Sequence, residues 1–258
     1  MTQDVRAGGL GEALAQAVAR VKARPTDVAG KLDLADLLIV TGDLERADSH
    51  LDLAGTMDPG FAVKAALVRQ LIRAETQRRE VVFAGRAPEL VQDVDRIIEG
   101  HLQRWLDWRE GRQVEVPQAD GRDLGGSVDG ASFVGVRDLD DRFSGVLEVL
   151  TSTGKYFWIP WSAVQSLTLA PPQRWRDIVW RQAELDLTDG PSGVVYIPAI
   201  YPAAPGEAGE ALQSGRQTDW KDEHGLVRGL GLKCLLVGDD CLSLNDFTTL
   251  LIAEPAQS

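Results

Sequence analysis

The chain has 258 residues and a formal net charge of −12, because 39 Asp and Glu residues outnumber 27 Lys and Arg residues. An acidic chain repels the phosphate backbone of nucleic acids, and no basic stripe in the sequence offsets that repulsion. The longest apolar runs, such as residues 232–237, fall far short of the roughly 20 residues that a membrane helix needs, and the N-terminus lacks a secretory signal pattern. We therefore predict a cytoplasmic protein that binds neither nucleic acid nor a membrane.

The sequence contains two cysteines, Cys234 and Cys241. They are too few for a disulfide framework, and they do not have the CxxC spacing of a zinc knuckle or a redox motif. We expect both to behave as small hydrophobic residues in a reducing compartment. No cofactor is predicted.

Apolar residues recur at helical spacing from residue 10 to about residue 112, which predicts an N-terminal helical domain over residues 1–112. Residues that stop or start helices divide this stretch. Pro25 and Gly42 each end a helix, and Gly85 ends another before Pro88 opens the last one. Five helices are expected, at residues 10–23, 28–41, 44–57, 61–83 and 88–110.

An internal repeat of 34 residues runs through these helices. This spacing separates Gly8 from Gly42 and Pro25 from Pro59, and it is the period of tetratricopeptide repeats. One copy is nearly complete, with small residues where two helices touch and larger ones in the seam: Leu34, Ala35, Leu38, Gly42, Ala47, Leu51, Ala54 and Pro59. The copy before it is weaker, because Arg20 stands where a small residue is expected. An ordinary antiparallel helix pair is the alternative to a tetratricopeptide-like domain.

After about residue 121 the apolar residues form short runs bounded by Gly, Pro and Asp, which are typical of strands. Strands are expected at residues 133–136, 145–151, 155–161, 164–169, 183–187, 193–201 and 232–238. A hairpin turn is expected at residues 152–154 and a short helix near residues 244–251. With a linker at residues 113–130, the sequence predicts an α+β protein. Residues 131–258 should form a β-rich domain, either a mostly antiparallel sheet or a partly open barrel.

A catalytic site requires convergent reactive groups, and the sequence offers few of them. The three histidines, His50, His101 and His224, are expected on the surface, without a nucleophile or a carboxylate at an informative spacing. No nucleophile elbow, P-loop or HExxH motif occurs. We therefore predict that the protein is not an enzyme.

The acidic run DLDDRF is the one candidate for a metal or acid–base site. Its residues Asp138, Asp140 and Asp141 could supply oxygen ligands to Mg²⁺ or Ca²⁺. However, the run lacks the pattern of a calcium loop, and Arg137 and Arg142 flank it. A salt-bridged turn that anchors the sheet is the favoured interpretation, and a metal-dependent enzyme is the alternative.

Four of the seven tryptophans stand in two pairs. Trp158 and Trp161 are three residues apart in an extended segment, so they should lie on opposite faces of it. Trp105 and Trp108 share one face of a helix, and we expect that pair to pack on the second domain.

The order of several segments resembles the TagJ/ImpE/SciE family of bacterial type VI secretion accessory proteins. DLADLLIVTGDLERADSHLDLAGTMDP is followed by LIRAE and VFAG, then by FVGVRDLDDRFSGVLEVLTSTGKYFWIPW, RDIVWRQAELDLTDGPSGVVYIPAIY, GRQTDW and VRGLG. Together these segments cover nearly the whole chain. The resemblance implies a tetratricopeptide-like helical domain joined to a C-terminal β-rich domain.

The resemblance also implies a non-enzymatic role as an adaptor. Its expected partners are the small sheath subunit, bound through an N-terminal helix of that subunit, and a ClpV-type AAA+ unfoldase that disassembles contracted sheath. In physical terms this is the binding of a guest helix in a groove.

The inner face of each first helix in a tetratricopeptide pair would form that groove. Repeat geometry alone places Asp36, Ile39 and Val40 beside Gln70 and Arg73 in it. The outer helix face and the β-rich domain are alternative binding surfaces. A purely structural subunit with a large exposed apolar patch is an alternative function.

Overall fold

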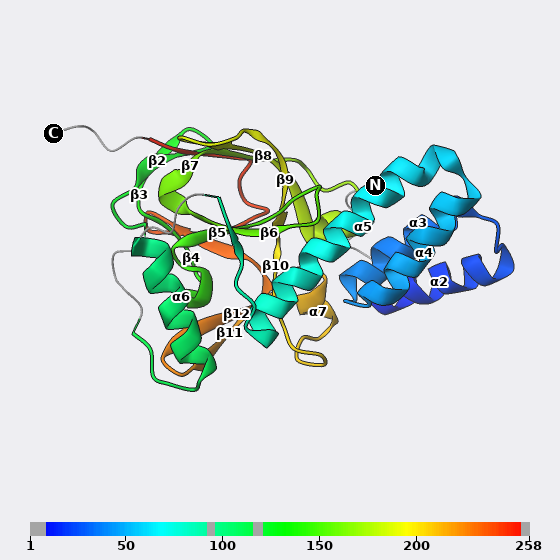
Figure 1. The fold of residues 1–258 in the computed structure, drawn as a ribbon, viewed down its shortest axis with the longest axis horizontal. Coiled ribbons are helices and arrows are strands. Elements are labelled where there is room, and N and C mark those ends of the chain that lie inside the picture. Colours follow the sequence, from blue (N-terminus) through cyan, green and yellow to red (C-terminus); the bar gives the residue numbers. More distant parts are fainter. Residues whose placement is uncertain (1–8, 92–95, 116–120, 254–258) are drawn as a thin grey trace.

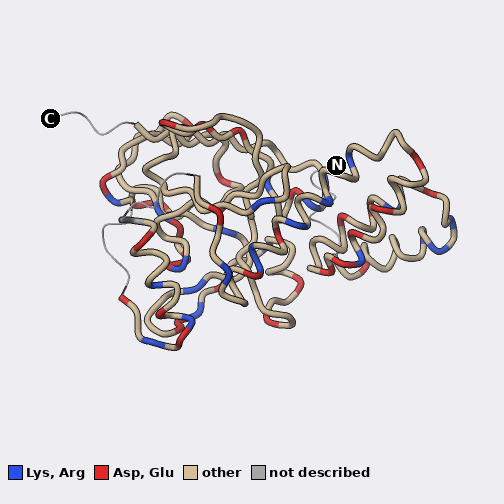
Figure 2. Tube along the Cα trace, viewed as in Figure 1, with Lys and Arg blue, Asp and Glu red and all other residues tan. Residues whose placement is uncertain are grey.

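The computed structural model describes residues 9–91, 96–115 and 121–253. A group of helices forms one end of the molecule and a large sheet lies towards the other, with the long helix α5 running from one to the other (Figure 1). Acidic and basic residues are interspersed along both parts (Figure 2). Within the described ranges, no helix combines the length and the apolar character needed to cross a membrane.

The helical end contains α2 Leu10–Ala23, α3 Val28–Val40, α4 Leu44–Met57, α5 Pro59–Arg79 and the π-helical turn η1 Glu80–Ala84. Carboxylates cap three of these helices. The side chains of Asp27, Asp43 and Asp58 accept hydrogen bonds from backbone amides in the first turns of α3, α4 and α5. Pro59 follows its cap in the first turn of α5, where a missing N–H leaves no hydrogen bond unmade.

Neighbouring helices in the chain are also neighbours in space, since α3 packs on both α2 and α4, and α4 packs on α5. The helices approach closely because Ala35 and Ala47, each with only a methyl side chain, are completely buried. Gly42 turns the chain after α3 with φ +82°, a conformation that glycine adopts without strain. Ala35 and Ala47, two of the small residues expected where helices touch, are therefore buried.

The last predicted helix starts later than expected. Pro88 does not open a helix, because Glu89–Leu90 form strand β1, which pairs in parallel with β6 of the sheet. Strand pairing satisfies backbone groups that a helix would have satisfied internally. Helix α6 spans Arg96–Arg109, and residues 92–95 of the predicted helix lie outside the described residues.

The large sheet has nine strands in the order β1-β6-β5-β9-β8-β7-β15-β2-β3. Every neighbouring pair except β1 and β6 is antiparallel. Besides β1, its strands are β2 Gly125–Val128, β3 Ala131–Val134, β5 Val146–Leu150, β6 Tyr156–Pro160, β7 Val164–Leu169, β8 Trp180–Leu187, β9 Gly193–Pro198 and β15 Thr249–Ile252. Within the described residues the edge strands β1 and β3 do not pair, so the sheet is open. Of the two predicted architectures, the sheet is therefore right and the barrel is wrong.

Two three-stranded sheets complete the β-rich part, in the orders β10-β12-β11 and β14-β13-β4. Their strands are β4 Val136–Asp138, β10 Ile200–Tyr201, β11 Thr218–Glu223, β12 Leu226–Leu232, β13 Cys234–Val237 and β14 Asp240–Ser243. The sequence predicts no strand at β11 or β14 and covers only the last residue of β12, because these segments are rich in glycine or in polar residues. A short helix, α7 Glu210–Gln213, precedes β11.

Two further expectations are corrected by the large sheet. Residues 113–130 are not a linker throughout, because Gly125–Val128 form β2. Residues 244–251 do not form a helix, because Thr249–Ile252 form β15. This strand lies between β7 and β2, and hydrogen bonds on both sides outweigh the local helical pattern. The domain boundaries themselves stay a prediction.

Two hydrophobic cores lie on opposite faces of the sheet. The core between the sheet and the helices contains Trp158 and Phe143, and the core on the other face contains Trp161. The predicted placement of these two tryptophans on opposite faces is confirmed. Trp105 of α6 meets Trp158 edge-on, with ring centroids 5.5 Å apart, and Trp108 packs against Trp105 at the same distance. The predicted packing of the α6 pair on the β-rich part is therefore also confirmed.

Candidate functional site

The face of α3 that the repeat assigns to partner binding is covered by the protein's own chain. Asp36 is only 2% exposed, beneath the 3-10 turn η4 (Trp175–Ile178). Arg174 Nε lies 2.6 Å from the carboxylate of Asp36, and Arg176 Nη1 lies 2.8 Å from it. Burial raises the pKa of Asp36, while the two positive charges oppose this shift. Asp36 is therefore not open to a guest helix.

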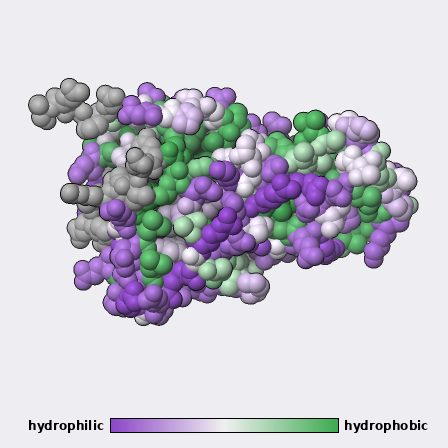
Figure 3. All heavy atoms as spheres, viewed as in Figure 1, coloured by the Kyte–Doolittle hydropathy of each residue, from purple (hydrophilic) through white to green (hydrophobic). Residues whose placement is uncertain are grey.

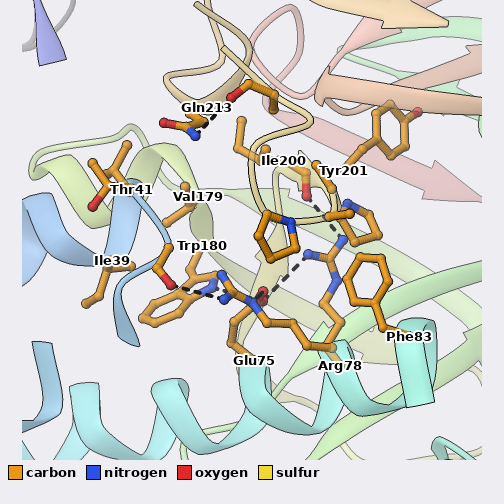
Figure 4. A pocket seen from close by; sticks show the side chains of 18 of the residues that line it. Ile39, Thr41, Glu75, Arg78, Phe83, Val179, Trp180, Ile200, Tyr201 and Gln213 are labelled. Carbon is orange, nitrogen blue, oxygen red and sulfur yellow. Dashed lines mark hydrogen bonds and ion pairs between the residues drawn. The ribbon is translucent and has the colours of Figure 1, made fainter. Parts of the chain in front are cut away.

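Farther along α3, Ile39 and Val40 line a pocket of about 540 Å³ at the junction of the helices with the β-rich part. Its walls are mostly apolar and include Phe83, Trp180 and Pro202. Figure 4 shows side chains of α5 reaching into this pocket from one side and the chain around β10 closing it from the other. Such a cavity suits the apolar side chain of a partner.

Charged residues of α5 form part of the pocket lining. Glu75 Oε1 accepts a hydrogen bond from Arg79 Nε at 3.1 Å, and Trp180 Nε1 lies 3.4 Å from Glu75 Oε2. Arg79 also donates to the carbonyl oxygen of Gly42 at 3.0 Å, where α3 ends. The described residues that line the pocket include no His, Ser or Cys.

Beside the pocket, a buried charge network ties α5 to the sheet. Arg78 donates to both carboxylate oxygens of Glu148 in β5, at 2.7 and 3.1 Å, and Lys233 Nζ donates to one of them at 2.9 Å. The hydroxyl of Tyr156 adds a third donor at 2.6 Å. Burial alone would raise the pKa of Glu148, but Arg78 and Lys233 outweigh burial and hold this pKa well below its ordinary value. Glu148 is thus an ionised anchor rather than a proton donor.

Each carboxylate of the DLDDRF run is already engaged. Asp138 accepts from Lys233, Asp140 accepts from the guanidinium of Arg142 at 2.9 Å, and Asp141 accepts from a backbone amide of β12 at 2.7 Å. Burial raises the pKa of Asp138, against the opposing charge of Lys233. Among the described residues, no group of three or more His, Cys, Asp or Glu side chains is placed to hold a metal. The contacts are those of the salt-bridged turn that the sequence favours.

The other two predicted groove residues, Gln70 and Arg73, lie on α5 and do not line the pocket. Gln70 is half-buried and Arg73 is exposed. The β5–β6 turn lies against Gln70, since a Cβ on Gly154 would come within 2.5 Å of its side-chain oxygen. The five predicted residues therefore do not share one open groove, because Asp36, Ile39 and Val40 are buried. Their role in partner binding stays a prediction.

Two smaller expectations are corrected. His101 is buried rather than on the surface, with its Nε2 2.5 Å from the carbonyl oxygen of Arg142 and its Nδ1 2.8 Å from Arg104 Nη2. A carbonyl can only accept, so Nε2 carries a proton.

Cys241 is exposed, whereas Cys234 is buried as expected. Burial raises the pKa of the Cys234 thiol to about 11, which leaves it protonated at neutral pH.

Sequence reasoning misses the residues that join the helices to the sheet. A signal for two of them is present, because Glu148 interrupts the apolar run VLEVL and Lys233 interrupts LGLKCLLV. A charge within a buried strand requires a partner. The partner itself could not be identified, since Arg78 lies 70 residues from Glu148 in the chain.

The fold and the junction together define an α+β protein whose helices are fixed to an open sheet by buried ion pairs. A family model described as ImpE protein matches residues 130–251. The chain is 33% identical over 251 residues to the type VI secretion system accessory component TagJ of Pseudomonas aeruginosa, and the alignment covers 92% of this chain and 86% of that protein. The crystal structure of protein VPA1032 from Vibrio parahaemolyticus matches with a TM-score of 0.82 and 27% sequence identity, over 96% of this chain and 95% of that chain. The chain belongs to the ImpE family.

Proposed function

We propose that this protein is a non-enzymatic accessory component of the bacterial type VI secretion system and acts as an adaptor in the cytoplasm. It binds the small sheath subunit through an N-terminal helix of that subunit, and it links this subunit to a ClpV-type AAA+ unfoldase. The observation that carries the proposal is the 33% identity to TagJ, a protein named as an accessory component of that system, over 92% of the chain.

The contacts of the acidic run favour the adaptor over the alternative, a metal-dependent enzyme. A metal site would need Asp138, Asp140 and Asp141 to turn free oxygen atoms toward one point. Instead, Lys233, Arg142 and a backbone amide already engage these carboxylates. Releasing them would leave buried cations unpaired, which is costly.

We also infer that α2 to α5 form about one and a half tetratricopeptide-like repeats. The 34-residue spacing and the burial of Ala35 and Ala47 support this interpretation. In such a domain the inner faces of α3 and α5 carry the binding surface. Because η4 covers Asp36 on α3, the free part of that surface lies on α5 and at the pocket beside Ile39 and Val40.

The proposal is tested with the purified chain and the small sheath subunit of the same secretion cluster. Isothermal titration should show saturable binding of the full-length sheath subunit. A sheath subunit that lacks its N-terminal helix serves as the control and should not bind. The absence of heat with both proteins, in a preparation whose circular dichroism shows folded protein, contradicts the proposal.

A further inference from the structure

One helix face of this protein already holds a short helical segment. On α3, Asp36 lies beneath η4, which brings Arg174 and Arg176 to within 2.8 Å of its carboxylate. The contact joins a negatively charged position on the helix to a positively charged turn from more than 130 residues away. The contact between α3 and η4 is therefore an example, within this chain, of a helix face that binds a helical segment of opposite charge.

The same positions recur 34 residues later on α5, where Gln70 and Arg73 stand in the places of Asp36 and Ile39. The first half of this face is open to solvent. Its residues are small or apolar: Ala62 and Ala66 lie one helical turn apart, as do Val63 and Leu67, and all are exposed except Leu67, which is half-buried. Val63 is 81% exposed, the largest exposure among the large hydrophobic residues in the described part of the chain. Figure 3 shows hydrophobic and hydrophilic side chains side by side at the helical end of the molecule.

Two cations flank the open face. Lys64 and Arg73 are both exposed. Lys64 lies over the ring of Phe61 and Arg73 donates a hydrogen bond to Gln70 at 3.4 Å, but neither forms an ion pair with a described residue. Helical periodicity places them on opposite sides of the row formed by Val63 and Leu67, about 13 Å apart along the axis. Cations without a carboxylate partner among the described residues are notable in a chain with a net charge of −12. The β5–β6 turn at Gly154 closes the far end of the face.

We propose that the open part of this face of α5, from Ala62 to Leu67, binds an acidic amphipathic helix of a protein partner, with Arg73 beside its closed end. The small side chains of Ala62 and Ala66 allow close approach of a second helix backbone, while Val63 and Leu67 supply apolar contact. Lys64 and Arg73 pair with carboxylates on either side of the guest. The charge arrangement is the reverse of that between α3 and η4. This inference rests on the proposed function, which it deepens by naming the surface and the chemistry of the guest.

Charge reversal tests the surface. In titrations with the small sheath subunit, Arg73→Glu and Lys64→Glu should each weaken binding at least about tenfold, and raising the salt concentration should weaken binding to the wild-type chain. Lys22→Glu on α2 makes the same change in net charge on another exposed helix and should leave the affinity unchanged. Equal affinity of the wild type and both α5 variants overturns the inference but leaves the proposed function standing.

If the sheath subunit does not bind at all, that result counts against the proposed function alone. A second probe then tests the inference. Two synthetic amphipathic helices with the same Leu and Ala face are compared by fluorescence anisotropy, one flanked by Glu and the other by Lys. Saturable binding of the Glu helix alone, lost in Arg73→Glu, supports the inference. The inference is overturned if neither helix binds or if both bind alike. Sedimentation that shows a dimer of this chain disrupted by Arg73→Glu also overturns it, because a second copy then occupies the face.

Discussion

Arg78 of α5 and Glu148 of β5 form a fully buried bidentate ion pair, with two N–O distances of 2.7 and 3.1 Å, that fixes the helices to the sheet. Removal of one partner leaves the other charge buried without compensation. We expect Arg78→Ala to lower the free energy of unfolding by about 3–5 kcal/mol in urea denaturation. The matched control is Arg69→Ala on the same helix, which removes partly exposed ion pairs with Asp48 and Asp52 and should cost about 1 kcal/mol or less. If both variants lower the free energy of unfolding equally, the Arg78–Glu148 pair does not anchor the helices.

Acid should weaken the same junction. The folded pKa of Glu148 is lower than its ordinary value of 4.5, so the unfolded chain binds a proton that the folded chain does not. The contribution of Glu148 to stability is therefore complete above that value and is lost as the pH falls from 4.5 toward the folded pKa. Urea unfolding at a series of pH values should show this decline, and Glu148→Gln should flatten it. The exposed control Glu45→Gln should keep the wild-type slope, and an unchanged slope in Glu148→Gln would assign the decline to other groups.

The contact between α3 and η4 should depend on Asp36. Asp36→Asn keeps the shape of the side chain but removes the charge that Arg174 and Arg176 share, with an expected cost of about 1–3 kcal/mol. Hydrogen exchange in η4 should become faster as the turn loosens. Asp33→Asn, at a half-exposed carboxylate that also pairs with Arg174, should change exchange much less. Unchanged exchange in the Asp36 variant would show that apolar packing alone holds η4.

The tight turn between β5 and β6 should require glycine. Gly154 has φ +83° and a Cβ there would lie 2.5 Å from Gln70, whereas Gly130 has φ +86° with no atom within 4 Å of such a Cβ. Both alanine variants bear the backbone strain of about 1–2 kcal/mol. Only Gly154→Ala also displaces Gln70. Thermal unfolding should therefore show a larger loss of stability for Gly154→Ala than for Gly130→Ala. Similar losses would mean that Gln70 simply moves aside.

Metal ions should have no effect on the acidic run. Because the carboxylates of Asp138, Asp140 and Asp141 are engaged by cations and backbone amides, calorimetric titration with Mg²⁺ or Ca²⁺ should give no saturable heat at millimolar concentration. EDTA should likewise leave the thermal unfolding temperature unchanged. Saturable binding that is lost in Asp141→Asn would instead support the metal-dependent alternative.

Local patterns in the sequence predict most of the elements. Helices over residues 10–23 and 44–57 and the strand over 164–169 have the predicted bounds, because capping residues and apolar periodicity act within a few residues. The prediction fails where a distant strand competes with a local preference. Glu89–Leu90 and Thr249–Ile252 read locally as helical, and both become strands because a neighbouring strand is available to pair with them.

The candidate site could be predicted only in part. The positions of Asp36, Ile39 and Val40 on one stretch of α3 follow from helical spacing, but their burial does not. Burial depends on η4, which reaches Asp36 from 138 residues away through Arg174. No periodicity in the sequence indicates a contact at that range.

The sequence by itself determined that helices precede strands, that small residues let neighbouring helices approach, and that Trp158 and Trp161 face opposite ways. Periods of 3.6 and 2 residues and capping side chains fix these features over short distances. The tertiary structure alone decided that Glu148 pairs with Arg78, and that η4 covers α3 while α5 keeps an open face. These outcomes depend on which distant groups can neutralise a charge removed from water, and that is settled only when the helices and the sheet pack together.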